Sequence, residues 1–429
     1  MLLASSSCAP LEPVQFGEPE TLRARYEEIR RLTEYLCKPL AVEDYVIQGM
    51  PDVSPPKWHL AHTTWFFETF VLALTAGYRA FDPLFSGLFN SYYEGAGAVY
   101  PRARRGLLSR PTVDEVFHYR AYVDHHVTAL LDNLMERENR DSIALLLVLG
   151  LNHEQQHQEL LLTDIKYNFS INPLAPAYRD LVATDGSFSP PLEFIEYGGG
   201  LHQIGHAGDG FAYDNEGPRH RICVEPYRLA NRPVTNAEFV RFIESGGYHE
   251  SRHWLSDGWQ LVKELGWEHP LYWRRIDTGW EVSTLGGVRP LDLHEPVCHV
   301  SFFEADAFAR WAEKRLPTEA EWELAACCES KGGNFLGSGH FHPVGGELSA
   351  MFFGNIWQWT QSPYTAYPGF RALNGTLGEY NGKFMSNQMV LRGGSCVTPA
   401  DHIRASYRNF FYPGQRWQFS GFRLAEAVI

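Results

Sequence analysis

The sequence contains little cysteine: seven residues among 429, an odd number with no regular spacing and no C-x-x-C pair. A disulfide-stapled scaffold is therefore excluded, and a reduced, cytoplasmic protein is expected. Long hydrophobic runs are also lacking, since the longest candidate, SIALLLVLG at 142–150, falls well short of the ~20 residues that cross a bilayer. The N-terminal MLLASSSCAP has no basic start and no proper hydrophobic segment, so we expect no signal peptide.

Basic residues are in the minority. Lysine and arginine total 37 against 51 acidic residues, and the net charge of −14 argues against nucleic acid or an anionic membrane as a partner. An apolar share of 44% and a charged share of 21% are typical of a globular protein. At ~150 residues per domain, the length predicts two or three domains. Aromatic residues, at 14% with 12 tryptophans, are the one excess.

The first part of the chain is predicted to be helical. Apolar residues recur at steps of three and four in 19–37, and similar patterns predict helices over 56–75, 112–135 and 141–167. Four helices of this length predict an antiparallel bundle. The connection at 76–111 is long and rich in glycine, tyrosine and arginine, which is typical of a functional loop.

Prolines change the character of the chain near residue 172. NPLAPAYRD (172–180) and SFSPPLEF (187–194) break the helical period. Beyond them only 234–246 and 301–315 predict clear helices, while short strands and glycine-rich turns dominate. The sequence therefore predicts an α+β protein with a helical domain at 1–171, a linker at 172–190 and a mixed domain at 191–429.

The string LNHEQQHQELLL (151–162) carries the sharpest chemical signal. His153 and His157 are four residues apart on a helical stretch, so both imidazoles project from one face, a spacing that suits two ligands of one metal ion. Glu154 completes H-E-x-x-H, which in zinc peptidases supplies two ligands and a general base. The H-x-x-G-x-x-H extension is missing, but the string alone leaves a zinc metallopeptidase as an alternative. A third possible function is that of a lectin-like binding module, in which the histidines would have no functional role.

A third metal ligand is expected from another helix. His59 and His62 lie three residues apart in WHLAH, while His118, His125 and His126 lie on the third predicted helix. Any one of them could instead be a structural histidine. A three-histidine site would leave about three positions free on an octahedral metal, which at iron is room for two substrates and oxygen.

The loop at 76–111 offers two further groups of candidate residues. Tyr92 and Tyr93 are either packing residues or part of a site. Arg102, Arg104 and Arg105 are either a solvated charge run or, beside a metal site in an acidic protein, a clamp for a substrate carboxylate.

Several strings in the second part resemble the formylglycine-generating-enzyme/sulfatase-modifying domain, whose fold is related to C-type lectins. They are PVTNAEFVRFIESGGY, RLPTEAEWELAA, GNIWQWTQSPY, LRGGS and GFRLA. The first part, with WHLAH and HEQQHQE, resembles a DinB-type four-helix domain. In this order, and with RNFFYPGQRWQFSGFRLA at the end, the two resemble the ergothioneine-biosynthesis sulfoxide synthases (EgtB family). The resemblance covers almost the whole chain and implies a DinB-like bundle followed by a C-type-lectin-like domain.

The resemblance implies a non-haem iron(II) enzyme that uses O2 to join the sulfur of a cysteine derivative to the imidazole of hercynine. Formylglycine-generating activity is not expected, because Cys396 follows the G-G-S turn directly and no second copper-binding cysteine follows it. Synthases that use γ-glutamylcysteine carry an acidic residue two positions after the Asn of R-N-W-D, where this chain has Phe411. L-cysteine is therefore the expected sulfur donor, with γ-glutamylcysteine as the alternative.

The resemblance also implies roles for individual residues. His62 would join His153 and His157 in binding Fe(2+). The mycobacterial-type enzymes use a tyrosine of the C-terminal domain as proton donor; none aligns with it here, so we expect Tyr92 or Tyr93 of the long loop to supply the proton near the oxygen position. Of the other matched positions, Gln156 would contact the hercynine imidazole, Asn409 and Phe410 its trimethylammonium group, and Tyr380 the same pocket. Arg102 and Arg105 are expected, from their place in the loop beside the metal site, to pair with the cysteine carboxylate.

Overall fold

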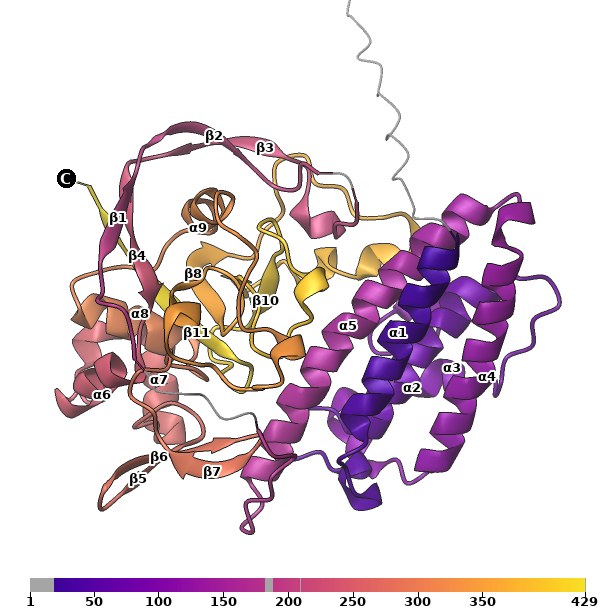
Figure 1. Cartoon of the computed structure of the whole chain (residues 1–429), viewed down its shortest axis with the longest axis horizontal. Helices are drawn as coiled ribbons and strands as arrows, with labels where there is room; N and C mark the ends of the chain where they lie inside the picture. Colours follow the sequence, from indigo (N-terminus) through magenta and orange to yellow (C-terminus); the bar gives the residue numbers. More distant parts are fainter. Residues whose placement is uncertain (1–18, 182–187, 209, 429) are drawn as a thin grey trace, which may run out of the picture.

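The computed structural model describes residues 19–181, 188–208 and 210–428 (Figure 1). Its first part is a bundle of four long helices: α1 (Pro19–Cys37), α2 (Pro56–Phe66), α4 (Val113–Asp132) and α5 (Arg140–Ser170). The predicted bundle is thus confirmed. In Figure 1, α5 lies on the side of the bundle that faces the rest of the chain.

Local sequence signals account for where the bundle helices begin and end. The Thr112 hydroxyl accepts the Glu115 amide at 3.2 Å, and the Glu115 carboxylate accepts the Thr112 amide at 2.6 Å, so α4 begins with a capping box. Helix α2 is fully buried and gives way to a π-helical turn over Phe67–Val71. The predicted helix over 56–75 is therefore regular only in its first half.

The connection at 76–111 contains α3 (Phe85–Leu88) and short 3-10 turns over Glu94–Ala96 and Arg102–Leu107. It therefore has local structure rather than being an irregular loop. Its aromatic segment, with Tyr92 and Tyr93, and its basic segment, with Arg105, reach the functional site described below.

The second part is built on a six-stranded sheet in the order β1-β4-β11-β8-β9-β10. Its strands are β1 (Phe194–Tyr197), β4 (Tyr227–Pro233), β11 (Ser420–Ala427), β8 (Trp357–Pro363), β9 (Met389–Arg392) and β10 (Asn409–Phe411). All neighbours are antiparallel except β8 and β11, which are parallel. Two small sheets complete it: β2 (Gly200–Ile204) with β3 (His220–Val224), and β5 (Trp273–Ile276), β6 (Gly279–Thr284) and β7 (Gly287–Pro290).

Four helices accompany these strands: α6 (Asn236–Glu244), α7 (Ser256–Leu265), α8 (Phe302–Trp311) and α9 (Glu319–Ala326). Helices α6 and α8 were predicted, but the expectation of only two clear helices was wrong. Helix α9 is only eight residues long, too short for a periodic pattern, and its start is fixed by Thr318 and Glu321, which form a capping box.

Helix α5 connects the two parts. Its Glu159 carboxylate accepts hydrogen bonds from Trp357 Nε1 at 2.6 Å, Ser395 Oγ at 2.9 Å and Thr398 Oγ1 at 2.6 Å, all from the second part. About two turns of the helix beyond Glu159, Lys166 Nζ lies 2.6 Å from His299 Nε2. Two sets of polar contacts, one partly buried at Glu159 and one buried at Lys166, therefore hold the second part against the helix that carries H-E-Q-Q-H.

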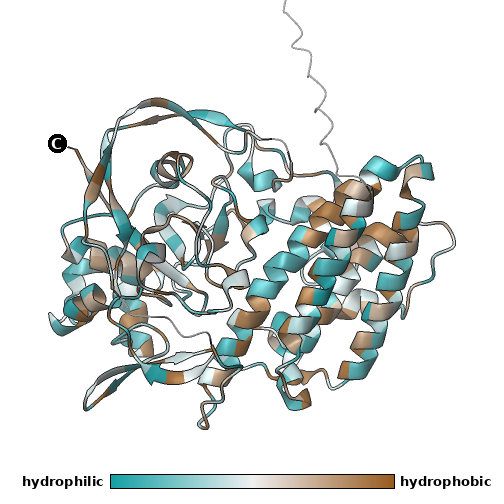
Figure 2. Cartoon of the chain, in the orientation of Figure 1, coloured by the Kyte–Doolittle hydropathy of each residue, from teal (hydrophilic) through white to brown (hydrophobic). Residues whose placement is uncertain are grey.

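Figure 2 shows hydrophilic and hydrophobic residues mixed along every bundle helix. No helix among the described residues has the length and apolar character needed to cross a membrane. The predicted linker at 172–190 lies partly outside the described residues, at 182–187, and so does MLLASSSCAP at the N-terminus.

Candidate metal centre

Three buried histidines converge where α2 meets α5. His62 comes from α2, and His153 and His157 from successive turns of α5; one ligand atom of each lies within 4.8 Å of the others. His62 Nε2 and His153 Nε2 are 3.2 Å apart. Two nitrogens bound at ~2.1 Å and at right angles on one ion are separated by about 3.0 Å, so this spacing fits a shared metal ion. Among the histidines left open by the sequence, the geometry favours His62 as the third ligand.

The three imidazoles are held neutral. Burial, followed by the proximity of His153, lowers the pKa of His62 and that of His157 well below the usual value. Burial likewise lowers the pKa of His153 to about 3. A metal ion can therefore bind at neutral pH without displacing histidine protons.

Aromatic side chains fix the orientation of the His62 ring. Trp58 stacks on one face, with centroids 4.5 Å apart and planes at 13°, and Trp65 stacks on the other at 5.5 Å and 15°. At the edge of the same ring, His62 Nδ1 donates a hydrogen bond to the Phe89 carbonyl at 2.6 Å. Because Nδ1 carries this hydrogen, Nε2 is the atom left for the metal.

Glu154 points away from the histidines, into the centre of the bundle. Its carboxylate accepts hydrogen bonds from Arg30 Nη1 at 2.9 Å, Arg120 Nη2 at 2.6 Å and Thr33 Oγ1 at 2.7 Å. Burial alone would raise the pKa of Glu154. The charges of Arg120 and Arg30 outweigh this effect and lower the pKa to about 2. A carboxylate paired in this way cannot serve as the general base of a zinc peptidase, so this alternative is rejected.

Gln156 connects α5 to two tyrosines of the second part. Its Oε1 accepts from the Tyr380 hydroxyl, and its Nε2 donates to the Tyr407 hydroxyl at 2.7 Å. The Tyr380 ring lies 5.8 Å from the His153 ring and stacks on Tyr213 at 5.4 Å. Tyr380 and Gln156 thus meet beside the histidines.

Tyr213 and Tyr407 were missed by the sequence reasoning. The only available signal was that Tyr407 directly precedes the RNFF string. Both side chains are buried, and burial raises the pKa of each.

Tyr92 and Tyr93 form a stacked pair, with centroids 4.5 Å apart and hydroxyls 3.4 Å apart. Tyr93 is buried between Trp65, at 5.7 Å, and Tyr380, at 6.4 Å. Burial raises the pKa of both tyrosines, so both hydroxyls carry their protons at neutral pH. The pair therefore lies in the aromatic shell around the histidines.

Asn409 and Phe410 lie on β10, at the edge of the main sheet. Phe410 stacks on Tyr364 at 4.0 Å and 12°, and faces Phe384 at 5.9 Å. Phe384 in turn contacts the Tyr92 ring edge-on at 5.0 Å. A row of aromatic rings thus joins β10 to the tyrosine pair.

The structure separates Arg102 from Arg105. Arg102 is exposed and donates to the Asp52 carbonyl oxygen. Arg105 is only 5% exposed; its guanidinium lies 3.3 Å from the centroid of the Trp58 ring and donates to Ser54 Oγ at 2.8 Å. Burial lowers the pKa of Arg105, although the Asp164 carboxylate acts in the opposite direction, and no salt bridge joins Arg105 to a carboxylate among the described residues.

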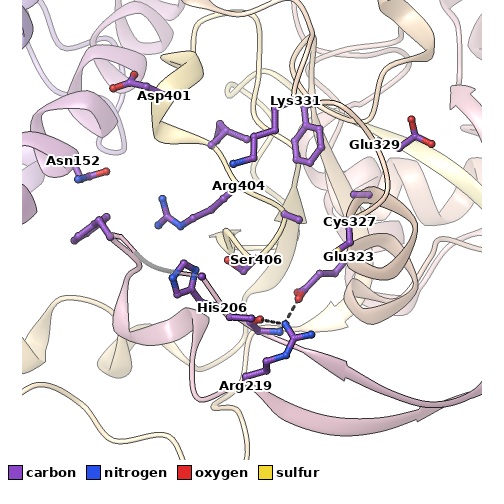
Figure 3. Close-up of a pocket in the computed structure, with 18 of the residues that line it drawn as sticks. Asn152, His206, Arg219, Glu323, Cys327, Glu329, Lys331, Asp401, Arg404 and Ser406 are labelled. Atoms are coloured by element: carbon purple, nitrogen blue, oxygen red, sulfur yellow. Dashed lines mark hydrogen bonds between the residues drawn. The ribbon is translucent and has the colours of Figure 1, made fainter. Parts of the chain in front are cut away.

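Two cavities lie near this centre, where α5 meets the second part. One, of about 470 Å³, is polar and includes Asn152, next to His153 (Figure 3). Two of its basic side chains already have partners, because Arg404 is paired with Glu216 and Arg219 donates to the Gly205 carbonyl. The other, of about 400 Å³, has apolar walls from α5 and reaches Tyr213 and Tyr380.

Comparisons with known proteins agree with this architecture. The DinB superfamily matches residues 25–161, and the sulfatase-modifying factor enzyme 1-like domain matches 185–352 and 338–428. The hercynine oxygenase of Mycolicibacterium thermoresistibile is 32% identical over 411 residues, covering 87% of this chain and 88% of that protein. That of Mycobacterium tuberculosis is 31% identical over 402 residues, covering 87% and 91%. The formylglycine-generating enzyme of Streptomyces coelicolor is 32% identical over 186 residues, covering only 37% of this chain. The chain therefore belongs to the hercynine oxygenase family, in which a DinB domain precedes a sulfatase-modifying-factor domain.

Proposed function

We propose that this chain joins the sulfur of L-cysteine to the imidazole carbon of hercynine, with Fe(II) as its metal and O2 as the oxidant, to give hercynylcysteine sulfoxide. The observation that carries the proposal is the buried triad of neutral histidines in a chain about 31% identical, over most of its length, to hercynine oxygenases. The reaction balances: one thiol hydrogen and one imidazole hydrogen leave with one oxygen atom as water, and the other oxygen atom ends on sulfur.

The donor set fits iron. Three imidazoles without a carboxylate leave a bound ion its full positive charge and about three free positions. When bound, Fe(II) would supply the activation of O2 and would favour cysteine as the thiolate. His62 and His153 are buried and His157 is partly buried, so the three rings are shielded from bulk water.

Hercynine would be held by polar and aromatic groups of both parts. Gln156, between the Tyr380 and Tyr407 hydroxyls, would bind the imidazole and orient its carbon toward the sulfur, which replaces a bimolecular encounter by proximity. The trimethylammonium group would lie against the Phe410 ring and the Asn409 amide oxygen, because the face of an aromatic ring attracts a quaternary cation.

Arg105 would hold the carboxylate of cysteine. It is a buried cation that forms no salt bridge among the described residues. The Asp164 carboxylate favours its charged form, but burial has the larger effect, so a substrate carboxylate would stabilise it. Arg102 would act from the exposed end of the same turn. Because Phe411 replaces the acidic residue that would hold a γ-glutamyl amine, cysteine is the proposed donor and γ-glutamylcysteine the alternative.

Tyr92 or Tyr93 would donate a proton from its hydroxyl to the oxygen atom that leaves as water. Both are protonated and lie in the aromatic shell around the metal ligands. Replacing the responsible tyrosine by phenylalanine should lower sulfoxide formation by roughly 10²–10⁴ and keep substrate binding, because the ring remains. Equal rates and product ratios in both single variants would assign the pair to packing.

Donor choice and the arginine clamp are tested together by steady-state kinetics with each thiol. We expect a higher kcat/KM for cysteine than for γ-glutamylcysteine. Arg105→Met should raise the KM for cysteine by at least ~30-fold, as expected from losing a buried charge-assisted pair, and should affect the KM for hercynine far less. Arg104→Met, at the exposed neighbouring position, is the matched control. Better turnover with γ-glutamylcysteine would reject the donor, and an unchanged KM in Arg105→Met would reject the clamp.

A further inference from the structure

One histidine of the WHLAH segment lies beside the metal donors without being among them. His59 is 3% exposed and sits one turn before His62 on α2. Its Nδ1 lies 2.9 Å from His157 Nδ1, and its Nε2 lies 3.0 Å from Asp164 Oδ2. Asp164 is equally buried and also accepts the Ser54 amide at 2.7 Å.

The direction of these hydrogen bonds follows from the Asp164 carboxylate, with which the series ends. A carboxylate only accepts, so His59 Nε2 must carry the hydrogen that it shares with Asp164. In the neutral imidazole, His59 Nδ1 is then a lone pair and an acceptor. The hydrogen between the two rings must therefore belong to His157 Nδ1. That assignment leaves His157 Nε2 without a hydrogen and therefore as the atom that can bind a metal.

The three metal-binding imidazoles therefore differ in the hydrogen-bond partner of Nδ1, the ring nitrogen that does not bind the metal. His62 Nδ1 donates to a neutral backbone carbonyl, and His153 Nδ1 has no hydrogen-bond partner among the described residues. Only His157 is joined, through a second imidazole, to a buried carboxylate. A hydrogen bond that ends on negative charge makes an imidazole more basic and locks the orientation of its ring.

We propose, on the basis of the metal site proposed above, that His59 and Asp164 are positioning residues which fix the tautomer of His157 and strengthen its bond to the metal. The hydrogen-bonded chain runs from Asp164 through His59 to His157, spans α5, α2 and α5 again, and is anchored by the Ser54 amide just before α2. It gives the centre one strong donor and two ordinary ones.

The tautomer is tested directly in the metal-free protein. With ¹⁵N-labelled histidine, long-range ¹H–¹⁵N correlation spectra distinguish a protonated Nδ1 from a protonated Nε2. We expect His157 to be protonated at Nδ1 and His59 at Nε2, and we expect the His157 preference to weaken in His59→Phe. A His157 ring protonated at Nε2 in the wild-type protein would overturn the proposal, whatever the enzyme's activity.

The metal bond is tested by the rate at which a chelator removes Fe(II) or Co(II) from the loaded full-length protein. His59→Phe, which keeps a ring but cannot accept the hydrogen bond, should lose metal ~10–100-fold faster. Asp164→Asn keeps an acceptor but not the charge and should show a smaller acceleration. Thr63→Val, a buried change on the same helix, controls for the packing of α2.

The outcomes separate this inference from the proposed function. Unchanged metal release in His59→Phe, or an equal acceleration in Thr63→Val, would mean that the chain from Asp164 only packs the helices. Failure of the wild-type protein to bind metal would reject the metal site itself, and the tautomer measurement would still decide the proton assignment.

Discussion

Replacing Glu154 by glutamine separates a structural carboxylate from a catalytic one. Glu154 is fully buried and accepts hydrogen bonds from both Arg30 and Arg120. Removing one member of a buried ion pair costs about 3–5 kcal/mol. Here the lower end applies, because Arg30 keeps Asp124 at 2.7 Å and Arg120 keeps Glu34 at 3.0 Å.

A loss of about 3 kcal/mol should lower the melting temperature by roughly 6–12 °C, at about 2–4 °C per kcal/mol for a unit of 150–250 residues. The assay is thermal denaturation of metal-free Glu154→Gln, paired with turnover of the metal-loaded variant at low temperature, where it remains folded. We expect a lower midpoint and retained turnover. Glu28→Gln, at an exposed position on α1, is the matched control and should leave the midpoint unchanged.

The opposite pattern would refute this reasoning. A general base of the peptidase type contributes to chemistry and little to stability, so its glutamine variant would keep the wild-type midpoint and lose turnover completely. That result would mean that Glu154 faces a metal-bound water rather than the two arginines.

Two further predictions concern the junction of the two parts. The Glu379 carboxylate accepts the Gly95 amide at 2.9 Å and so fastens the loop that carries the tyrosine pair; Glu379→Gln should increase hydrogen exchange over 92–97, measured by mass spectrometry, with no change at α5. Burial lowers the pKa of Lys166 to about 8 in the folded protein, below its value in the unfolded chain. Between these two pKa values Lys166 is protonated in the unfolded chain but not in the folded protein, so the free energy of unfolding should rise with pH from about 8 to 10. Urea unfolding at pH 7 and 9.5 checks this, and Lys166→Met should abolish the rise.

The helical pattern predicts much of the bundle and the metal pair from sequence. Long apolar periods place the bundle helices, and the four-residue spacing of His153 and His157 puts them on one face whatever surrounds them. The third ligand stays open because it depends on how α2 packs against α5, which no local pattern encodes. The resemblance supplied His62, and the geometry agrees with it.

The role of Glu154 could not be predicted, because its partners lie on α1 and α4, far away in the sequence. The difference between Arg102 and Arg105 has the same origin, since tertiary packing on Trp58 buries only one of them. Tyr213 comes from a loop of the second part and was not expected at all. The domain boundary at 172–190 and the substrate contacts of individual residues stay predictions.

The central claim is tested most directly by the product of the metal-loaded enzyme. Protein purified without oxygen and loaded with Fe(II) is supplied with hercynine, cysteine and air, and the products are identified by mass spectrometry. The account predicts hercynylcysteine sulfoxide carrying one oxygen atom from O2, and no product from a His62→Ala variant. Oxidation of cysteine alone with hercynine unchanged, or peptide cleavage by the zinc-loaded protein, would contradict it.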